Sequence, residues 1–145
     1  LKYRNIQSQD LFYNNYGAPF LTNGSYISIS HSELFVAVCL SKEKVGIDLQ
    51  IKNEKIFKVS NKFINDLEKK LTEKNNLEKL THLWTIKEAA YKYFTVGKLS
   101  LKNDIIVKQL GDDSNLQING LGKHLNLKSK TIITPNYICS LVYDE

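Results

Sequence analysis

The chain has 145 residues, of which 42% are hydrophobic and 10% aromatic, enough for one domain with a buried core and too few for a second independent domain. We therefore predict a single domain over residues 1–145. The 20 lysines and arginines outnumber the 15 aspartates and glutamates and give a net charge of +5, which favours acidic partners without choosing among nucleic acid, nucleotide, membrane and protein.

The sequence predicts a soluble protein of the cytoplasm. No apolar run approaches the roughly 18 to 20 residues of a membrane span, and residues 1–20 are too polar for a signal peptide. Cys39 and Cys139 lie in the apolar runs FVAVCL and YICSLV, where free thiols behave as small hydrophobes. This favours free thiols in a reducing compartment over a disulfide between them. The chain begins with Leu1 and contains no methionine, so we expect further residues upstream.

The first half of the chain contains three predicted strands. Residues 1–24 hold the turn signals NNYGAPF and TNG, and the alternation in SYISIS predicts a strand over 25–30. The apolar run at 34–40 and the alternating run at 45–51 are joined by the polar residues SKEK, which predicts two strands paired antiparallel through a tight turn. Residues 54–74 lack glycine and proline and predict one helix or two short ones.

The strongest helical pattern covers residues 77–94. Its apolar side chains recur at spacings of three and four: Leu77, Leu80, Trp84, Tyr91 and Phe94. Asn75 or Asn76 can cap its start and Gly97 can end it. Further strands are predicted in DIIVKQL, LQING, KTIIT and YICSLVY. These elements indicate an α+β fold in which strands and helices do not alternate regularly.

The strand over 45–51 has two chemically different faces. Val45, Ile47, Leu49 and Ile51 point one way, whereas Gly46, Asp48 and Gln50 point the other. One interpretation is an edge strand with its polar side in water. The other is that Asp48 and Gln50 supply oxygen ligands to a site.

Glu88 offers a partner for that second interpretation. It lies four residues after Trp84 and three before Tyr91, on the helical stripe expected to face the core. A surface salt bridge to Lys92 would explain it and would contribute only about 0.3 to 0.5 kcal/mol. Alternatively, Asp48, Gln50 and Glu88 surround one Mg²⁺, which commonly takes one or two carboxylates together with waters and phosphate oxygens.

The segment SISHS adds Ser30 and His31 close to these strands, without a Ser-His-Asp order that would indicate a hydrolase. Lys87 and Lys92 supply positive charge on the helix that carries Glu88. Each lysine alone is typical of a solvated surface. Together with a metal they would suit a diphosphate, because cations already in place stabilise charge on a leaving phosphate.

Three motifs in this order resemble the 4′-phosphopantetheinyl transferases, particularly the surfactin-synthetase-activating type. They are ISHS at 29–32, VGIDLQ at 45–50 and WTIKEAAYK at 84–92. The resemblance extends from YGAPFL at 16–21 to the closing YICSLVYD. It implies the fold of that family, a small antiparallel sheet packed against a long helix.

The resemblance also implies an activity and its residues. The enzymes transfer the 4′-phosphopantetheine arm of coenzyme A to a serine of an apo acyl or peptidyl carrier protein, as in fatty acid biosynthesis, and release adenosine 3′,5′-bisphosphate. Asp48, Glu88 and Gln50 would bind Mg²⁺. The remaining residues implied to bind coenzyme A are Ser30, His31, Lys87 and Lys92. Glu88 would also accept the serine proton, and Lys92 would hold the diphosphate.

Departures from the family pattern keep an alternative open. Gln50 stands where the family usually has a glutamate, and Ala18 stands where YGKP would supply a lysine. The surfactin type also has two similar halves with the site between them. The resemblance leads us to expect that this chain lacks much of the first half, which allows a homo-oligomer. The alternative is a catalytically weakened relative that binds coenzyme A or a carrier protein. A nucleic-acid module is disfavoured, since no RNA-binding aromatic motif or zinc spacing occurs.

Overall fold

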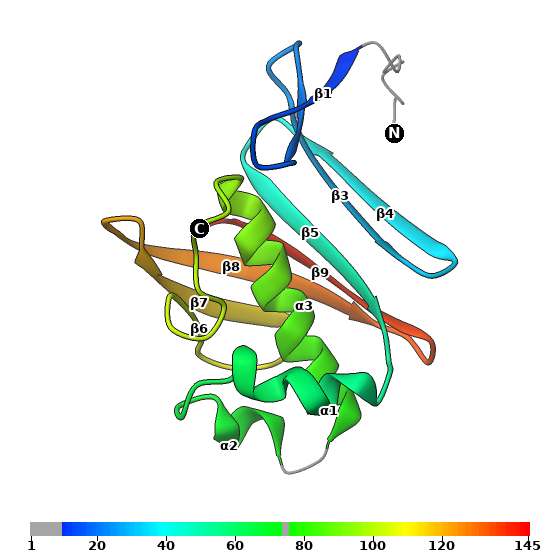
Figure 1. Ribbon diagram of the computed structural model, residues 1–145, viewed down its shortest axis with the longest axis vertical. Coiled ribbons are helices and arrows are strands. Elements are labelled where there is room, and N and C mark those ends of the chain that lie inside the picture. Colours follow the sequence, from blue (N-terminus) through cyan, green and yellow to red (C-terminus); the bar gives the residue numbers. More distant parts are fainter. Residues whose placement is uncertain (1–9, 74–75) are drawn as a thin grey trace.

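An antiparallel sheet of five strands, in the order β5-β9-β8-β7-β6, forms the centre of the structure (Figure 1). The computed structural model describes residues 10–73 and 76–145. The strands of this sheet are β5 (Val45–Ile51), β6 (Ile105–Val107), β7 (Asp113–Gly120), β8 (Lys123–Ile133) and β9 (Tyr137–Asp144). All four strands predicted after residue 100 are therefore confirmed.

The helix α3 (Leu77–Phe94) crosses one face of this sheet (Figure 1). Asn76 caps its start by accepting a hydrogen bond from the Lys79 amide at 3.0 Å, and Thr95 ends it with a left-handed φ of 56°. Its inner face fills the core together with apolar side chains of the sheet. The predicted helix and the α+β class are confirmed, and the helix stops before Gly97.

Gly46 lets the backbone of α3 lie directly on β5. A Cβ atom at this position would be 2.0 Å from the Ala89 carbonyl oxygen and 2.6 Å from the Tyr93 amide nitrogen. Because side chains alternate along a strand, Asp48 and Gln50 lie on the same face of β5 as Gly46. β5 is an edge strand of its sheet, but its polar face is turned toward the helix and away from bulk water.

Serine side chains cover the free edge of β5. β3 (Tyr26–Ser32) and β4 (Phe35–Ser41) form a hairpin. The hydroxyls of Ser28, Ser30 and Ser32 accept hydrogen bonds from backbone amides of β5 at 2.9, 3.1 and 3.2 Å. These bonds satisfy amides that would otherwise be buried without partners.

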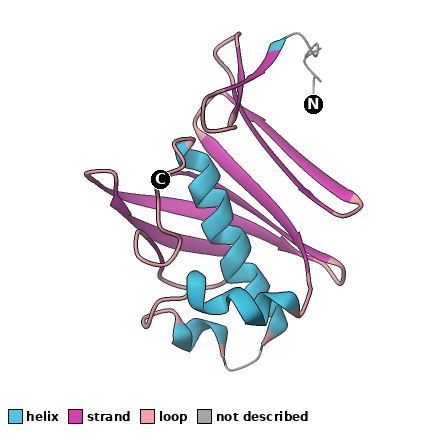
Figure 2. Cartoon of the chain, viewed as in Figure 1, coloured by secondary structure: helices cyan, strands magenta, loops and turns pink. Residues whose placement is uncertain are grey.

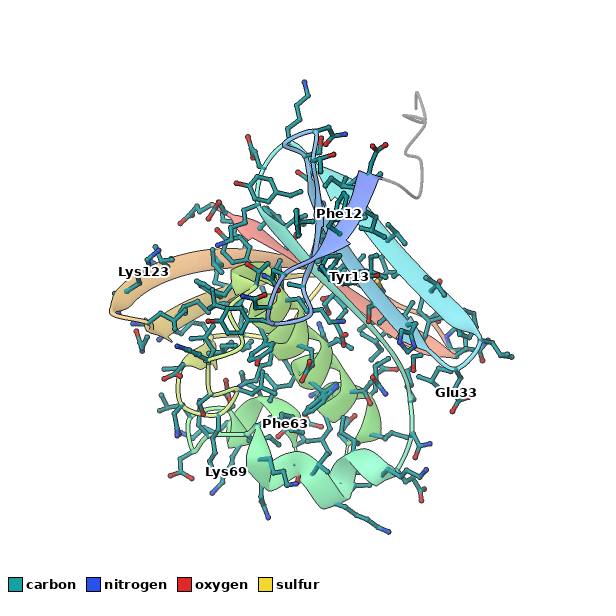
Figure 3. All side chains as sticks on the ribbon, turned by 45° about the horizontal axis from the view of Figure 1, so that its top comes forward. Phe12, Tyr13, Glu33, Phe63, Lys69 and Lys123 are labelled. Atoms are coloured by element: carbon teal, nitrogen blue, oxygen red, sulfur yellow. The ribbon has the colours of Figure 1, made fainter. Side chains whose placement is uncertain are left out.

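The predicted pairing of residues 34–40 with 45–51 is wrong. β4 pairs with β3, and β5 pairs with β9. The hairpin closes at Glu33, which lies at its tip (Figure 3) and has a φ of 51°. This turn is shorter than the SKEK linker, and the linker instead carries the chain from the hairpin into the central sheet.

Short elements surround this framework. β1 (Leu11–Tyr13) and β2 (Pro19–Leu21) pair with each other. The segment predicted as helical over 54–74 forms α1 (Lys55–Val59), the 3₁₀ turn η2 (Ser60–Lys62) and α2 (Lys69–Thr72); residue 74, like the alternative cap Asn75, lies outside the described residues. Figure 2 shows these short helices at the end of the sheet where α3 begins.

The two cysteines and the helices bear on the expected compartment. Cys39 and Cys139 are half-buried and, as predicted, free. Within residues 10–73 and 76–145, no helix combines the length and apolar character needed to cross a membrane.

Lys87 is an internal cation that ties α3 to its neighbours. Its side chain is fully buried and pairs with Glu68 at 2.7 Å. Its ammonium also donates to the carbonyl oxygens of Phe63, Leu101 and Ile105 at 2.7, 2.7 and 2.8 Å. The Glu68 carboxylate in turn accepts a hydrogen bond from the β6 amide at Val107. The prediction that Lys87 contacts coenzyme A is therefore corrected, because its donors are used inside the fold.

We predict that Glu68→Gln destabilises the protein by about 3 to 5 kcal/mol, because it leaves the buried Lys87 charge without its counter-ion. Urea unfolding measures the change in the free energy of unfolding. Lys69→Met is the matched control, since Lys69 pairs with Asp66 on the same segment but both side chains are exposed; its loss should stay below about 1 kcal/mol. Equal losses in the two variants would contradict the role given to the buried pair.

Candidate active site

A stripe of side chains on α3 faces the polar side of β5. Trp84, Glu88 and Lys92 lie four residues apart and so occupy one face of the helix. Across from them, Asp48 is 5% exposed. Its Oδ1 atom accepts a hydrogen bond from the Lys92 ammonium at 2.7 Å. Lys92 therefore pairs with Asp48, and the surface salt bridge to Glu88 considered from the sequence does not form.

The second oxygen of Asp48 is unusual. Oδ2 is buried and, among the described residues, has no hydrogen-bond partner. A buried carboxylate oxygen without a partner is costly, and native structures rarely leave one without a functional reason. Asp48 Oδ2 is thus an atom to which a ligand could bind.

Glu88 shares this electrostatic environment. Burial and the neighbouring Asp48 charge raise the pKa of Glu88 to about 7, although Lys92 opposes the shift. Burial also raises the pKa of Asp48, against the opposing effects of Lys92 and Ser30. Two carboxylates and one lysine therefore meet in a partly desolvated place whose negative charge is incompletely balanced.

These donors fit a hard divalent cation. Asp48 offers its unpartnered oxygen, Glu88 a carboxylate that disfavours ionisation without a partner, and Gln50 an amide oxygen on the same face of β5. No group of three histidine, cysteine, aspartate or glutamate side chains that could hold a metal occurs in the part of the chain that the structure describes. A Mg²⁺ ion here would depend on two carboxylates and complete its shell with an amide, waters or phosphate oxygens.

A pocket of about 160 Å³ lies at the Lys92 side of the carboxylates. It is lined by the turn before β2, by one end of β3 and by the last turns of α3: Tyr16, Gly17, Ala18, Pro19, Ile27, Ser28, Ile29, Tyr91, Lys92, Thr95 and Gly97. We call it the lysine-side pocket. His31 is exposed on β3 and, by strand alternation, shares a face with Ile27 and Ile29.

A second pocket, of about 350 Å³, lies at the opposite side. It is lined by Ser32, Glu33, Gln50, Ile51, Asn53, Lys55, Ile56, Val59 and Trp84. We call it the tryptophan-side pocket. The order along α3 is Trp84, Glu88, Lys92, and the order along β5 is Gln50, Asp48, Gly46. Both elements therefore place the two carboxylates between the two pockets.

Ser30 does not reach the lysine-side pocket. Ser30 is 4% exposed. Its hydroxyl donates to Asp48 Oδ1 at 2.8 Å, and its Oγ accepts a hydrogen bond from the Leu49 amide at 3.1 Å. The prediction that Ser30 contacts coenzyme A is corrected for this reason. Of the residues predicted from the sequence, the structure brings together Asp48, Glu88 and Lys92. Gln50 lines the tryptophan-side pocket, and His31 is exposed on β3 without a described contact to the carboxylates.

Asn14 is a residue of this region that the sequence prediction missed. Its side-chain oxygen accepts the amides of Tyr16 and Ala18, each at 2.9 Å, and its side-chain nitrogen donates to the Thr95 carbonyl at 3.0 Å. Asn14 therefore shapes the turn that lines the lysine-side pocket and joins it to the end of α3. Asn14, three residues before Gly17, belongs to a turn signal in the sequence. Its hydrogen bond to Thr95 joins residues far apart in the sequence, so a local pattern does not predict it.

Comparison with known proteins gives two matches. Residues 44–142 match the family model of the 4′-phosphopantetheinyl transferase superfamily. The chain is also 30% identical over 100 residues to the 4′-phosphopantetheinyl transferase gsp of Aneurinibacillus migulanus. The aligned region covers 65% of this chain and 41% of the relative. The chain thus spans about two-fifths of that relative's length. The family match includes Asp48, Glu88 and Lys92, whereas Ser30 and His31 precede it.

We predict a pH-dependent stabilisation by Glu88→Gln in the metal-free protein. The folded-state pKa of Glu88, about 7, lies above its ordinary value of 4.5, so its contribution to stability is complete below pH 4.5 and is lost as the pH rises to about 7. Near pH 8 in EDTA, the variant should be more stable than the parent by about 1 to 3 kcal/mol, and near pH 4 the two should be similar.

Urea unfolding at both pH values measures this difference. Glu33→Gln, at the exposed tip of the hairpin, controls for the loss of a carboxylate from the surface. A Glu88→Gln protein no more stable than the parent near pH 8 would show that Glu88 is not in the desolvated environment described.

Proposed function

Because the chain belongs to the 4′-phosphopantetheinyl transferase superfamily, we propose that it transfers the 4′-phosphopantetheine arm of coenzyme A to a serine of an apo acyl or peptidyl carrier protein. The observation that carries the proposal is the pair of partly desolvated carboxylates, Asp48 and Glu88, beside Lys92 and between two pockets. A transferase with two substrates needs such a centre with an approach from each side.

Asp48 and Glu88, with Gln50, would hold Mg²⁺. When bound, the ion would neutralise charge on the diphosphate of coenzyme A. Asp48 brings a buried oxygen that lacks a partner among the described residues, and Glu88 would ionise more readily beside a cation than it does without one. The ion would therefore give Asp48 Oδ2 a partner and would favour the ionised form of Glu88.

Lys92 would bind the diphosphate from the lysine-side pocket. Its side chain is 29% exposed and its ammonium contacts only one oxygen of Asp48 among the contacts described, so further donors are available for phosphate oxygens. His31, on the face of β3 that continues from this pocket, would contact another phosphate of coenzyme A. Ala18 lines the pocket without a charge, so the lysine contact of the family pattern is not made there.

Glu88 would act as the general base. Its carboxylate would be ionised beside the cation and could then accept a proton from a hydroxyl within hydrogen-bond reach. The serine oxygen bonds to the phosphorus that carries the pantetheine arm, and the bond from this phosphorus to the bridging oxygen breaks. Adenosine 3′,5′-bisphosphate leaves, and Glu88 receives the serine proton.

The acceptor serine would enter from the tryptophan-side pocket. In phosphoryl transfer, the attacking and leaving oxygens lie roughly in line on opposite sides of phosphorus. With the diphosphate held from the Lys92 side, the hydroxyl must approach from the side of Gln50 and Trp84. The net charge of +5 would favour association with an acidic carrier protein. Free thiols at Cys39 and Cys139 suit a reducing cytoplasm.

A weakened relative that binds without transferring is the second candidate, and Gln50 favours it. An amide oxygen carries no charge, so the site would hold Mg²⁺ less tightly than one with glutamate at this position. The two candidates differ in what Gln50→Glu should do. Under the transferase proposal the variant gains activity at limiting metal, whereas under the binding proposal neither parent nor variant modifies a carrier.

We predict that Glu88→Gln lowers transfer at least 100-fold, because it removes a charged ligand and the general base, and that Gln50→Glu lowers the Mg²⁺ concentration needed for half-maximal rate. The assay incubates each protein with coenzyme A, Mg²⁺ and several apo-carrier proteins and reads the intact mass of each carrier. Glu43→Gln, at an exposed position in the linker before β5 and outside the lining of both pockets, serves as the surface control. Transfer by Glu88→Gln at the parent rate would defeat the catalytic assignment.

A further inference from the structure

The Ser30 hydroxyl both accepts and donates a hydrogen bond within the protein. The Leu49 amide donates to its oxygen at 3.1 Å, so the hydroxyl proton is directed elsewhere, and it reaches Asp48 Oδ1 at 2.8 Å. The side chain is 4% exposed.

The two oxygens of Asp48 consequently differ. Oδ1 accepts two hydrogen bonds, from Ser30 and from Lys92, whereas Oδ2 accepts none among the described residues. Turning the plane of the carboxylate away from this position would break both bonds, so Ser30 and Lys92 favour an orientation in which one oxygen is bonded and the other is free. Oδ2 remains the oxygen available to a cation.

We propose that Ser30 is a positioning residue that holds Asp48 with Oδ2 free for a divalent cation, an inference that rests on the proposed function. Lys92 would share its donors with the diphosphate when coenzyme A binds. Ser30, which lies away from the pocket, would then be the donor that keeps Asp48 oriented. Partners that orient metal ligands from behind commonly affect metal affinity by 10- to 100-fold.

Ser28 and Ser32 provide matched controls on the same strand. Each accepts one backbone amide of β5, at 2.9 and 3.2 Å, as Ser30 does. Within the described residues, the hydrogen bond to a carboxylate belongs to Ser30. Alanine at any of the three positions therefore removes one bond between the hairpin and β5, and only alanine at position 30 also frees Asp48.

The test measures Mn²⁺ affinity by electron paramagnetic resonance and stability by urea unfolding, with no substrate present. We expect Ser30→Ala to weaken Mn²⁺ binding about tenfold, and Ser28→Ala and Ser32→Ala to change it less than about twofold. All three variants should lose stability through the missing bond to β5, and Ser30→Ala, which also loses the bond to Asp48, should lose the most. Ser30→Thr, which keeps a hydroxyl, should restore most of the affinity. If Ser30→Ala does not fold, Ser30→Cys keeps the size with a weak donor and should show the same loss.

Equal loss of affinity in all three alanine variants, or none in Ser30→Ala, would overturn the positioning role and leave the serines as a strand clamp. A parent that binds no Mn²⁺ would overturn it as well. A parent that binds Mn²⁺ through Asp48, with the predicted loss in Ser30→Ala, but modifies no apo-carrier would support the positioning role and defeat only the proposed function.

Discussion

The contact of the α3 backbone with β5 at Gly46 is the constraint on which the site depends. Any side chain at this position would collide with the carbonyl of Ala89 or the amide of Tyr93. With the two backbones touching, the next side chains on this face of β5, Asp48 and Gln50, must lie against the helix stripe that carries Glu88 and Lys92. In this arrangement, burial of Glu88 and the charge of Asp48 raise the pKa of Glu88 to about 7.

Two internal polar clusters hold this arrangement in place. The buried pair of Lys87 and Glu68 fixes the side of α3 that faces the short helices and β6. The serines of β3 hold β5, because their side chains attach the hairpin to the edge of this strand. Because the hairpin binds β5 through side chains, the backbone of β5 still pairs with β9 along its other edge. The same attachment brings Ser30 to Asp48.

The sequence predicted the elements well because their signals are local. The cap at Asn76, the apolar spacing of α3 and the alternation of the later strands depend on residues a few positions apart. The pairing of β4 was mispredicted because a two-residue turn after Ser32 competes with the longer SKEK linker, and strand alternation does not identify a partner. Alternation also showed that Asp48 and Gln50 share a face, but not that this face meets the helix.

The errors at Lys87 and Ser30 have a common origin. A motif groups residues that are adjacent in sequence, but adjacent residues on a helix point about 100° apart. Lys87 and Glu88 therefore contact different parts of the structure. The spacing of Lys87 from Leu80 and Leu83 is that of an inward-facing residue and indicated its burial. For Ser30 no such signal exists, since its partner Asp48 is defined by the packing of the hairpin on β5.

We propose that Asp48 and Glu88 hold a divalent cation that brings the diphosphate of coenzyme A to Lys92. Calorimetric titration of coenzyme A with Mg²⁺ and with EDTA tests it most directly, in the parent and in Asp48→Asn. We expect Mg²⁺ to strengthen binding to the parent by at least about tenfold, equivalent to about 1.4 kcal/mol, and to have little effect on Asp48→Asn. Equal affinity of the parent in Mg²⁺ and in EDTA would contradict this proposal.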